Sequence, residues 1–140
     1  MDEHLWVPVL VLIEQGVNGS DLDTLDTVLS PDVLVRSPLV SPGGREGFKQ
    51  FLLDLRRAFP DAYLRVQDFV SSGDTIYWRW TLEGTQEKAF RGIPSSGRRI
   101  EVDGVNIDKI DHGVIVEHWS FWDPASLARQ LRGDADFLNS

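Results

Sequence analysis

The sequence predicts an α+β fold, in which a strongly curved mixed or antiparallel sheet wraps around N-terminal helices to form a cone-shaped barrel. Hydrophobic residues recur at helical spacing up to residue 59, and from residue 62 their period changes to two, as in strands. Helices that precede a run of strands favour an α+β fold over a parallel βαβ sheet. A cone of this kind leaves a cavity at one end, where we expect a ligand to bind.

Length and composition narrow the functional classes. The 140 residues suit one domain spanning 1–140, with a poorly structured tail after about residue 132. The absence of cysteine excludes disulfides and a thiolate nucleophile, and the three scattered histidines argue against a metal site. A net charge of −8 without a basic stripe argues against nucleic acid and membrane partners. The apolar run at 5–13 follows acidic residues and is too short to span a bilayer, so we expect a cytoplasmic protein.

Three segments predict helices before the main run of strands. The first begins near Leu5 and ends at Gly16 or in the Asn-Gly-Ser that follows shortly after. The second covers 21–29, with Asp21 as its N-cap. The third, 45–59, is strongly amphipathic. We expect the apolar sides of these helices to pack inside the cone.

Strands are predicted at 30–39, 63–70, 75–83, 100–110 and from 114 to about 122. In the third of these the alternation is clean and places Trp78 and Trp80 on one face, with Tyr77 and Arg79 on the other. In the fourth the apolar phase moves from even to odd positions at Gly104. We therefore expect a β-bulge at that glycine.

The expected bulge and a tight turn at 111–113 decide which residues share a face of the last two strands. They place Val105 opposite Trp119 and Asp103 opposite Phe121. The face that results carries Val105, Ile107, Trp119, Phe121 and Asp123. We expect this face to line the cavity.

Asp123 has two possible roles. It precedes Pro124, a preferred first residue of a helix, and 124–131 has a helical pattern, so Asp123 is a strong candidate N-cap. A carboxyl group among aromatic side chains such as Trp119 and Phe121 can also transfer protons in catalysis. One oxygen can cap the helix while the other faces the cavity, so both roles remain open.

The chain resembles the SnoaL-like polyketide cyclases of the nuclear transport factor 2-like superfamily. The resemblance rests on AFPD at 58–61, GDTIYWRWTLEGT at 73–85, FRGIPSSGR at 90–98 and DHGVIVEHWSFWD at 111–123, in matching order and spacing. It implies a cone-shaped α+β barrel, a homodimer through the outer face of the sheet, and cofactor-free acid/base chemistry such as aldol closure of polyketide intermediates.

The resemblance also implies site residues. It places the catalytic acid/base at Asp123 and a histidine partner on the preceding strand, although residues 99–110 contain no histidine. Ketosteroid isomerases of the superfamily carry a base just before a proline in the first strand, and here that position is Ser37.

We therefore expect a cofactor-free enzyme of specialised metabolism that cyclises, isomerises or cleaves an apolar, cyclic, polyketide-like molecule, with Asp123 as the acid or base. The pocket would be shaped by Trp78, Trp80, Trp119 and Phe121. Ser37 or Arg36 would polarise a carbonyl group. Two alternatives stay open: a non-catalytic ligand-binding or scaffold domain, and an epoxide-hydrolase-like enzyme with Asp103 as a second carboxylate.

A homodimer is expected from the opposite face of the same strands. Tyr77, Arg79 and His118 combine aromatic and polar groups there, as protein interfaces often do. On this interpretation His118 belongs to the interface and not to the cavity.

Overall fold

The computed structural model describes residues 5–19, 21–40 and 43–133, and the tail expected to be poorly structured lies mostly outside these ranges. The elements are α1 (Trp6–Val11), the π-helix η2 (Leu12–Val17), the 3₁₀ helix η3 (Asp23–Thr27), β1 (Leu29–Arg36), α2 (Arg45–Ala58), β2 (Tyr63–Ser72), β3 (Thr75–Thr85), β4 (Arg99–Asp111), β5 (Val114–Phe121) and α3 (Pro124–Arg132). No helix within the described ranges is long and apolar enough to cross a membrane.

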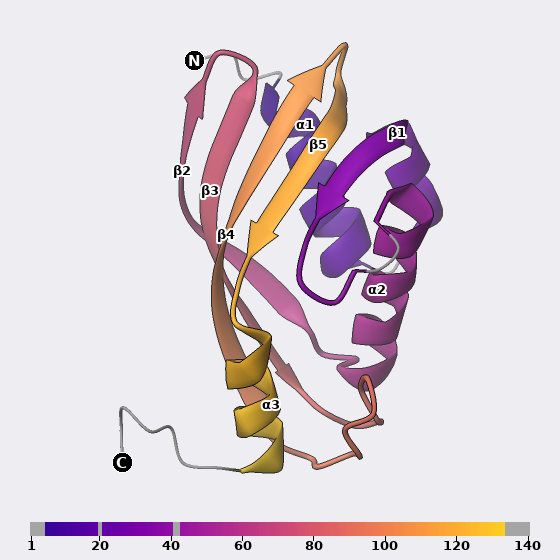
Figure 1. Ribbon diagram of the computed structural model, residues 1–140, viewed down its shortest axis with the longest axis vertical. Coiled ribbons are helices and arrows are strands. Elements are labelled where there is room, and N and C mark those ends of the chain that lie inside the picture. The colour runs from indigo at the N-terminus through magenta and orange to yellow at the C-terminus, as the bar shows by residue number, and fades with distance from the viewer. Residues whose placement is uncertain (1–4, 20, 41–42, 134–140) are drawn as a thin grey trace.

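The strands form one curved, open sheet in the order β1-β5-β4-β3-β2. Pairing is antiparallel except between β1 and β5, which run parallel, so the sheet is mixed. Helices α1 and α2 lie on its concave side, and α3 follows β5 at one end (Figure 1). The predicted α+β cone is thus confirmed, with a sheet that does not close into a full barrel.

The helices follow the predicted patterns with one exception. In α2 the buried side chains are Phe48, Phe51, Leu52, Leu55 and Ala58, as its amphipathic pattern predicts. The first helix continues as η2 to Val17. The predicted second helix shortens to one 3₁₀ segment because Leu29 already belongs to β1. Its N-cap residue is Leu22 and not Asp21, although the Asp21 carboxylate lies just before it and accepts a hydrogen bond from the Thr24 amide (3.3 Å). A hydrogen bond from the Thr24 hydroxyl is the main cause of the lowered pKa of Asp21.

The expected bulge at Gly104 is wrong. β4 pairs with β3 without interruption, and its even-numbered residues face inward along its whole length. Gly104 lies opposite Trp80, and a Cβ atom at Gly104 would lie 2.1 Å from Trp80 Cζ2. The glycine is therefore explained by a tryptophan ring that lies directly on the strand, which is the close approach that only glycine allows.

The register of β4 and β5 differs from the prediction by two residues because the irregularity lies at Lys109–Ile110. Val105 pairs with Phe121, and Ile107 pairs with Trp119. These side chains do share a face, but it is the outer face: Val105 is 42% exposed and Phe121 is 53% exposed. The cavity is therefore lined by the residues of opposite parity.

Candidate active site

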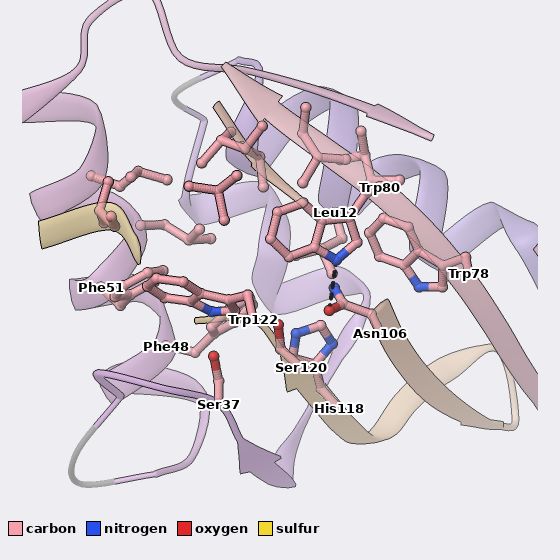
Figure 2. Close-up of a pocket in the computed structure, with 18 of the residues that line it drawn as sticks. Leu12, Ser37, Phe48, Phe51, Trp78, Trp80, Asn106, His118, Ser120 and Trp122 are labelled. Carbon is pink, nitrogen blue, oxygen red and sulfur yellow. Dashed lines mark hydrogen bonds between the residues drawn. The ribbon is translucent and has the colours of Figure 1, made fainter. Parts of the chain in front are cut away.

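An apolar cavity lies between the inner face of the sheet and the helices. The helical walls come from Leu12, Ile13, Val17, Phe48, Phe51, Leu52, Leu55 and Leu127. The sheet side and its connections contribute Ser37, Leu64, Trp78, Trp80, Leu82, Phe90, Val102, Asn106, His118, Ser120 and Trp122. Apart from the tryptophans, whose rings are mainly apolar, the lining has four polar side chains: Ser37, Asn106, His118 and Ser120. The polar groups gather toward one part of the cavity (Figure 2).

The cavity is narrow. The space open to the centre of a water molecule is about 70 Å³. One water needs roughly 10–15 Å³ in the same measure, so the cavity in this conformation has room for a ligand the size of several waters. Rings of Phe51 and Trp122 lie 6.4 Å apart and those of Phe51 and Phe90 lie 6.5 Å apart, measured between centroids. A polycyclic ligand would need these aromatic walls to move.

A buried aspartate–histidine pair forms the centre of the polar region. Asp108 on β4 and His118 on β5 are directly opposite each other, and Asp108 Oδ1 lies 2.5 Å from His118 Nδ1. His118 is 2% exposed and packs against the ring of Phe48 at 4.8 Å. An ionised carboxylate can only accept hydrogen bonds, so Nδ1 carries the proton. In the neutral ring Nε2 then has the free lone pair, and no described residue donates to it.

Two tryptophans of β3 hold the polar residues of β4. Trp78 Nε1 donates to Asp108 Oδ2 (2.8 Å), and Trp80 Nε1 donates to Asn106 Oδ1 (2.9 Å). The register partner of Trp78 is Asn106 and that of Trp80 is Gly104. Each indole therefore bonds to the residue two positions further along β4 than its own register partner. The tryptophans therefore serve as cavity walls and also fix the orientation of the polar side chains behind them.

Three of the residues predicted to bind a ligand do line the cavity. They are Trp78, Trp80 and Ser37, the last just beyond the end of β1. Their inward position follows from the clean alternation of β3 and from the place of Ser37 after the first strand.

The other predicted ligand-binding residues lie outside the cavity. Trp119 and Phe121 are on the outer face of β5, and Arg36, paired with Trp119, is exposed. Asp103 is exposed, and its carboxylate accepts a hydrogen bond from Thr81 Oγ1 (2.6 Å). The absent bulge at Gly104 explains the errors at Trp119 and Phe121, because it inverted the parity of the β4 positions after Gly104 that were expected to share a face with them.

Asp123 does not face the cavity, contrary to the expectation from the family resemblance. Its carboxylate accepts a hydrogen bond from the backbone amide of Ala125 (2.9 Å), and Pro124 begins α3. The Asp123 side chain is 64% exposed, with Arg129 at 3.7 Å. The helix-capping role is therefore confirmed, and the pairing of Asp123 with aromatic cavity walls is not present.

Sequence reasoning missed Asp108, and it placed His118 on the wrong face. Asn106 is a residue type that can orient a ligand carbonyl, but the expected bulge at Gly104 turned it away from the cavity. The signal that could have found them is spacing: Asn106 and Asp108 are two apart, as are His118 and Ser120, and each pair lies in a strand of the same hairpin. The aspartate–histidine pair of the structure joins Asp108 on β4 to His118 on β5, and it does not include Asp123, the aspartate that the family resemblance implied.

Comparisons with known proteins agree with this fold. A family model described as SnoaL-like polyketide cyclase matches residues 9–131. The chain is 32% identical to TsrD from Streptomyces laurentii, with 94% of this chain and 97% of that one covered and a TM-score of 0.78. It is also 32% identical to IdmH from Streptomyces antibioticus, with 89% and 96% covered and a TM-score of 0.76.

A SnoaL-like protein from Jannaschia sp. CCS1 shares the fold at 22% identity, with 94% of each chain covered and a TM-score of 0.82. No curated protein matches the chain.

Proposed function

The chain belongs to the SnoaL-like polyketide cyclase family, and we propose that it is a cofactor-free enzyme that moves protons on an apolar, cyclic carbonyl compound bound in the cavity. The products would be those of cyclisation, isomerisation or lyase chemistry. The observation that carries this proposal is the buried Asp108–His118 pair, whose free ring nitrogen belongs to a side chain that lines the cavity.

The proposed role of His118 is to remove and return a proton. The lone pair of Nε2 accepts a proton from a carbon next to a carbonyl group, and the ring becomes an imidazolium. Asp108 holds the ring by Nδ1 and stabilises the positive charge that forms, while Trp78 keeps the carboxylate in place. This arrangement uses the same logic as an aspartate that orients a catalytic histidine in hydrolases.

The cavity supports a mainly apolar ligand. Most of its lining is aliphatic or aromatic. Figure 2 shows the few polar groups in one part of the cavity, an arrangement that suits a single polar functional group of the ligand. The narrow space favours a small ring system first, with larger polycyclic molecules requiring Phe51, Phe90 or Trp122 to move.

A deuterium-exchange assay tests the proposal without knowledge of the natural substrate. Acetophenone and alpha-tetralone are incubated with the protein in D₂O, and uptake of deuterium at the carbon next to the carbonyl is followed by mass spectrometry. We expect the protein to accelerate uptake, and His118→Gln to lower the acceleration by about 100-fold or more, the usual contribution of a general base.

Asp108→Asn is the sharper variant, because it preserves shape. Its amide oxygen can still accept from Trp78, but its NH₂ group donates to His118 Nδ1 and moves the ring proton to Nε2. We expect a loss as large as that of His118→Gln. Asp123→Asn and Asp103→Asn, both outside the cavity, are the matched controls and should retain the activity.

Two outcomes would contradict the proposal. Exchange that survives in His118→Gln would remove His118 from the chemistry. Binding of the ketones without any exchange would favour the alternative of a non-catalytic ligand-binding domain.

We also propose that the protein is a homodimer through the outer face of the sheet. One row across the strands consists of Val70, Tyr77, Ile107 and Trp119, each the register partner of the next. Val105 and Phe121 pair in the neighbouring row. An apolar patch of this kind on an exposed sheet face is typical of an interaction surface. His118, expected at this interface, is buried in the cavity instead.

A further inference from the structure

The amide of Asn106 is fixed in one orientation. Indole N–H groups can only donate, so the atom of Asn106 that faces Trp80 Nε1 at 2.9 Å must be the oxygen Oδ1. The NH₂ group of Asn106 is consequently turned away from Trp80. Gly104 makes this contact possible, because the Trp80 ring occupies the space that a side chain there would fill.

The Asn106 NH₂ group is a hydrogen-bond donor without a partner at the cavity. Asn106 is 6% exposed and lines the cavity, and among the described residues its nitrogen has no hydrogen-bond acceptor. Ser120 is the register partner of Asn106 on β5, lines the same cavity, and its hydroxyl likewise has no partner in the described part of the chain. Both groups line the cavity and have no acceptor among the described side chains, so they are free to donate to the oxygen of a molecule bound there.

We propose that Asn106 Nδ2 and Ser120 Oγ form an oxyanion subsite that binds the oxygen of an enolate, which restricts the substrate class to enolisable ketones and related carbonyl compounds. This inference rests on the proposed role of His118 for its catalytic meaning. The two donors lie two register pairs along the β4–β5 ladder from Asp108 and His118, on the same inward face, because the pair between them, Ile107 and Trp119, faces outward. A carbonyl oxygen and its neighbouring C–H can therefore face the donors and the base together, and Figure 2 shows Asn106, Ser120 and His118 in one part of the cavity.

The step balances within the substrate and His118. Nε2 takes the proton from the carbon next to the carbonyl, the C–H electron pair becomes a C=C bond, and the C=O π electrons move to the oxygen. The resulting enolate oxygen accepts hydrogen bonds from Asn106 and Ser120, where preorganised donors stabilise developing charge most effectively. The enolate carbon then regains a proton from His118, or it attacks a second carbonyl group and His118 protonates the new alkoxide.

Binding of para-nitrophenolate tests the subsite directly. This probe is a planar, delocalised oxyanion of one ring, like an enolate, and its neutral and ionised forms differ in absorbance. We expect the protein at about pH 8, where carboxyl side chains are normally ionised, to bind the phenolate more tightly than para-nitroanisole, the neutral analogue. Asn106→Asp retains an oxygen for Trp80 but replaces the NH₂ donor, and it should weaken phenolate binding about 10- to 100-fold while para-nitroanisole binding changes little.

Two further variants complete the test. Gln67→Glu adds the same negative charge on the far side of the sheet, where Gln67 donates to Thr81, and it should leave phenolate binding unchanged. Ser120→Ala should weaken phenolate binding about tenfold, and it keeps the proposal testable if Asn106→Asp does not fold.

The subsite is overturned if the protein does not prefer the phenolate to the neutral analogue, or if both ligands lose affinity equally in Asn106→Asp and in Ser120→Ala. Failure of the proposed function is a different result. In that case His118→Gln would still exchange deuterium, while the selective loss of phenolate binding in Asn106→Asp would remain.

Discussion

Gly104→Ala is expected to disrupt the site through the position of a single ring. The new Cβ atom would lie 2.1 Å from Cζ2, 2.5 Å from Cε2 and 2.7 Å from Cη2 of Trp80. Non-bonded carbon atoms pack at about 3.5–4.0 Å, so the indole must move by more than about 1 Å. Trp80 is buried between the strand and the helices, and its displacement also stretches the 2.9 Å hydrogen bond to Asn106.

The expected cost has two parts. Forcing an extra methyl group into a packed core costs about 1–3 kcal/mol, and leaving buried donor and acceptor groups unpaired costs about 1–3 kcal/mol more. The free energy of unfolding should therefore fall by about 2–6 kcal/mol. For a domain of this size each kcal/mol lowers Tm by about 3–4 °C, so Tm should fall by about 6–24 °C. Phenolate binding at Asn106 should weaken as well, because the amide loses the contact that orients it.

Thermal unfolding followed by circular dichroism measures the effect, with Gly84→Ala as the control. Gly84 lies in β3, and a Cβ atom there would meet its neighbours at 3.3 Å or more, so only a small loss is expected. Gly104→Ala is then repeated in a Trp80→Phe background, where Cζ2 and Cη2 are absent. A coupling energy of at least about 1 kcal/mol is expected between the two positions. The reasoning is refuted if Gly104→Ala costs no more than Gly84→Ala, or costs the same with and without the indole.

Three other outcomes are expected. Asp123→Ala should lower stability by about 1 kcal/mol while Asp123→Asn is nearly neutral in thermal melts, because asparagine caps a helix about as well as aspartate; equal losses would contradict the capping role. Phe121→Asp should convert a dimer of about twice 15.8 kDa into monomers in light scattering, and a parent protein that is already monomeric would refute the interface. The hydrogen bond from the Thr85 amide lowers the pKa of Asp61 below its usual 3.8, so the stability that ionised Asp61 contributes is present above that pH and is lost as pH falls through the lowered pKa. The free energy of unfolding of Asp61→Asn should therefore fall less steeply with acidification than that of the parent, and an unchanged slope would exclude Asp61 as a contributor.

The parts of the fold that the sequence predicted well are those in which polarity reports burial. The amphipathic pattern of α2 and the alternation of Trp78 and Trp80 in β3 mark faces that pack against the core, and the structure buries them as expected. Asp123 before Pro124 predicted a helix start, and the capping hydrogen bond confirms it. In each of these cases the hydrophobic effect and backbone geometry favour the same arrangement.

The β4–β5 hairpin was predicted poorly because its polarity is inverted. Asn106 and Asp108 are polar but face inward, and Val105 and Phe121 are apolar but face outward. Binary patterning assumes the opposite. Asp108 and Asn106 accept hydrogen bonds from Trp78 and Trp80 on the neighbouring strand. Partners this far apart in the chain cannot be recognised from the residues around either position. The candidate site was therefore the part of the molecule that pattern reasoning located least accurately.

The parallel pairing of β1 with β5 has a consequence for how the nascent chain folds. β1 joins the sheet only through β5, as the bond from the Ile115 amide to the Val28 carbonyl shows, so its partner is synthesised more than seventy residues later. The hairpins of β2, β3 and β4 involve much shorter loops and can form earlier on the ribosome. Until β5 emerges, His118 has not been placed against Asp108, and the first strand has no neighbour to bond. Translation that stalls within β5 would thus leave β1 outside the sheet and Asp108 without its histidine partner.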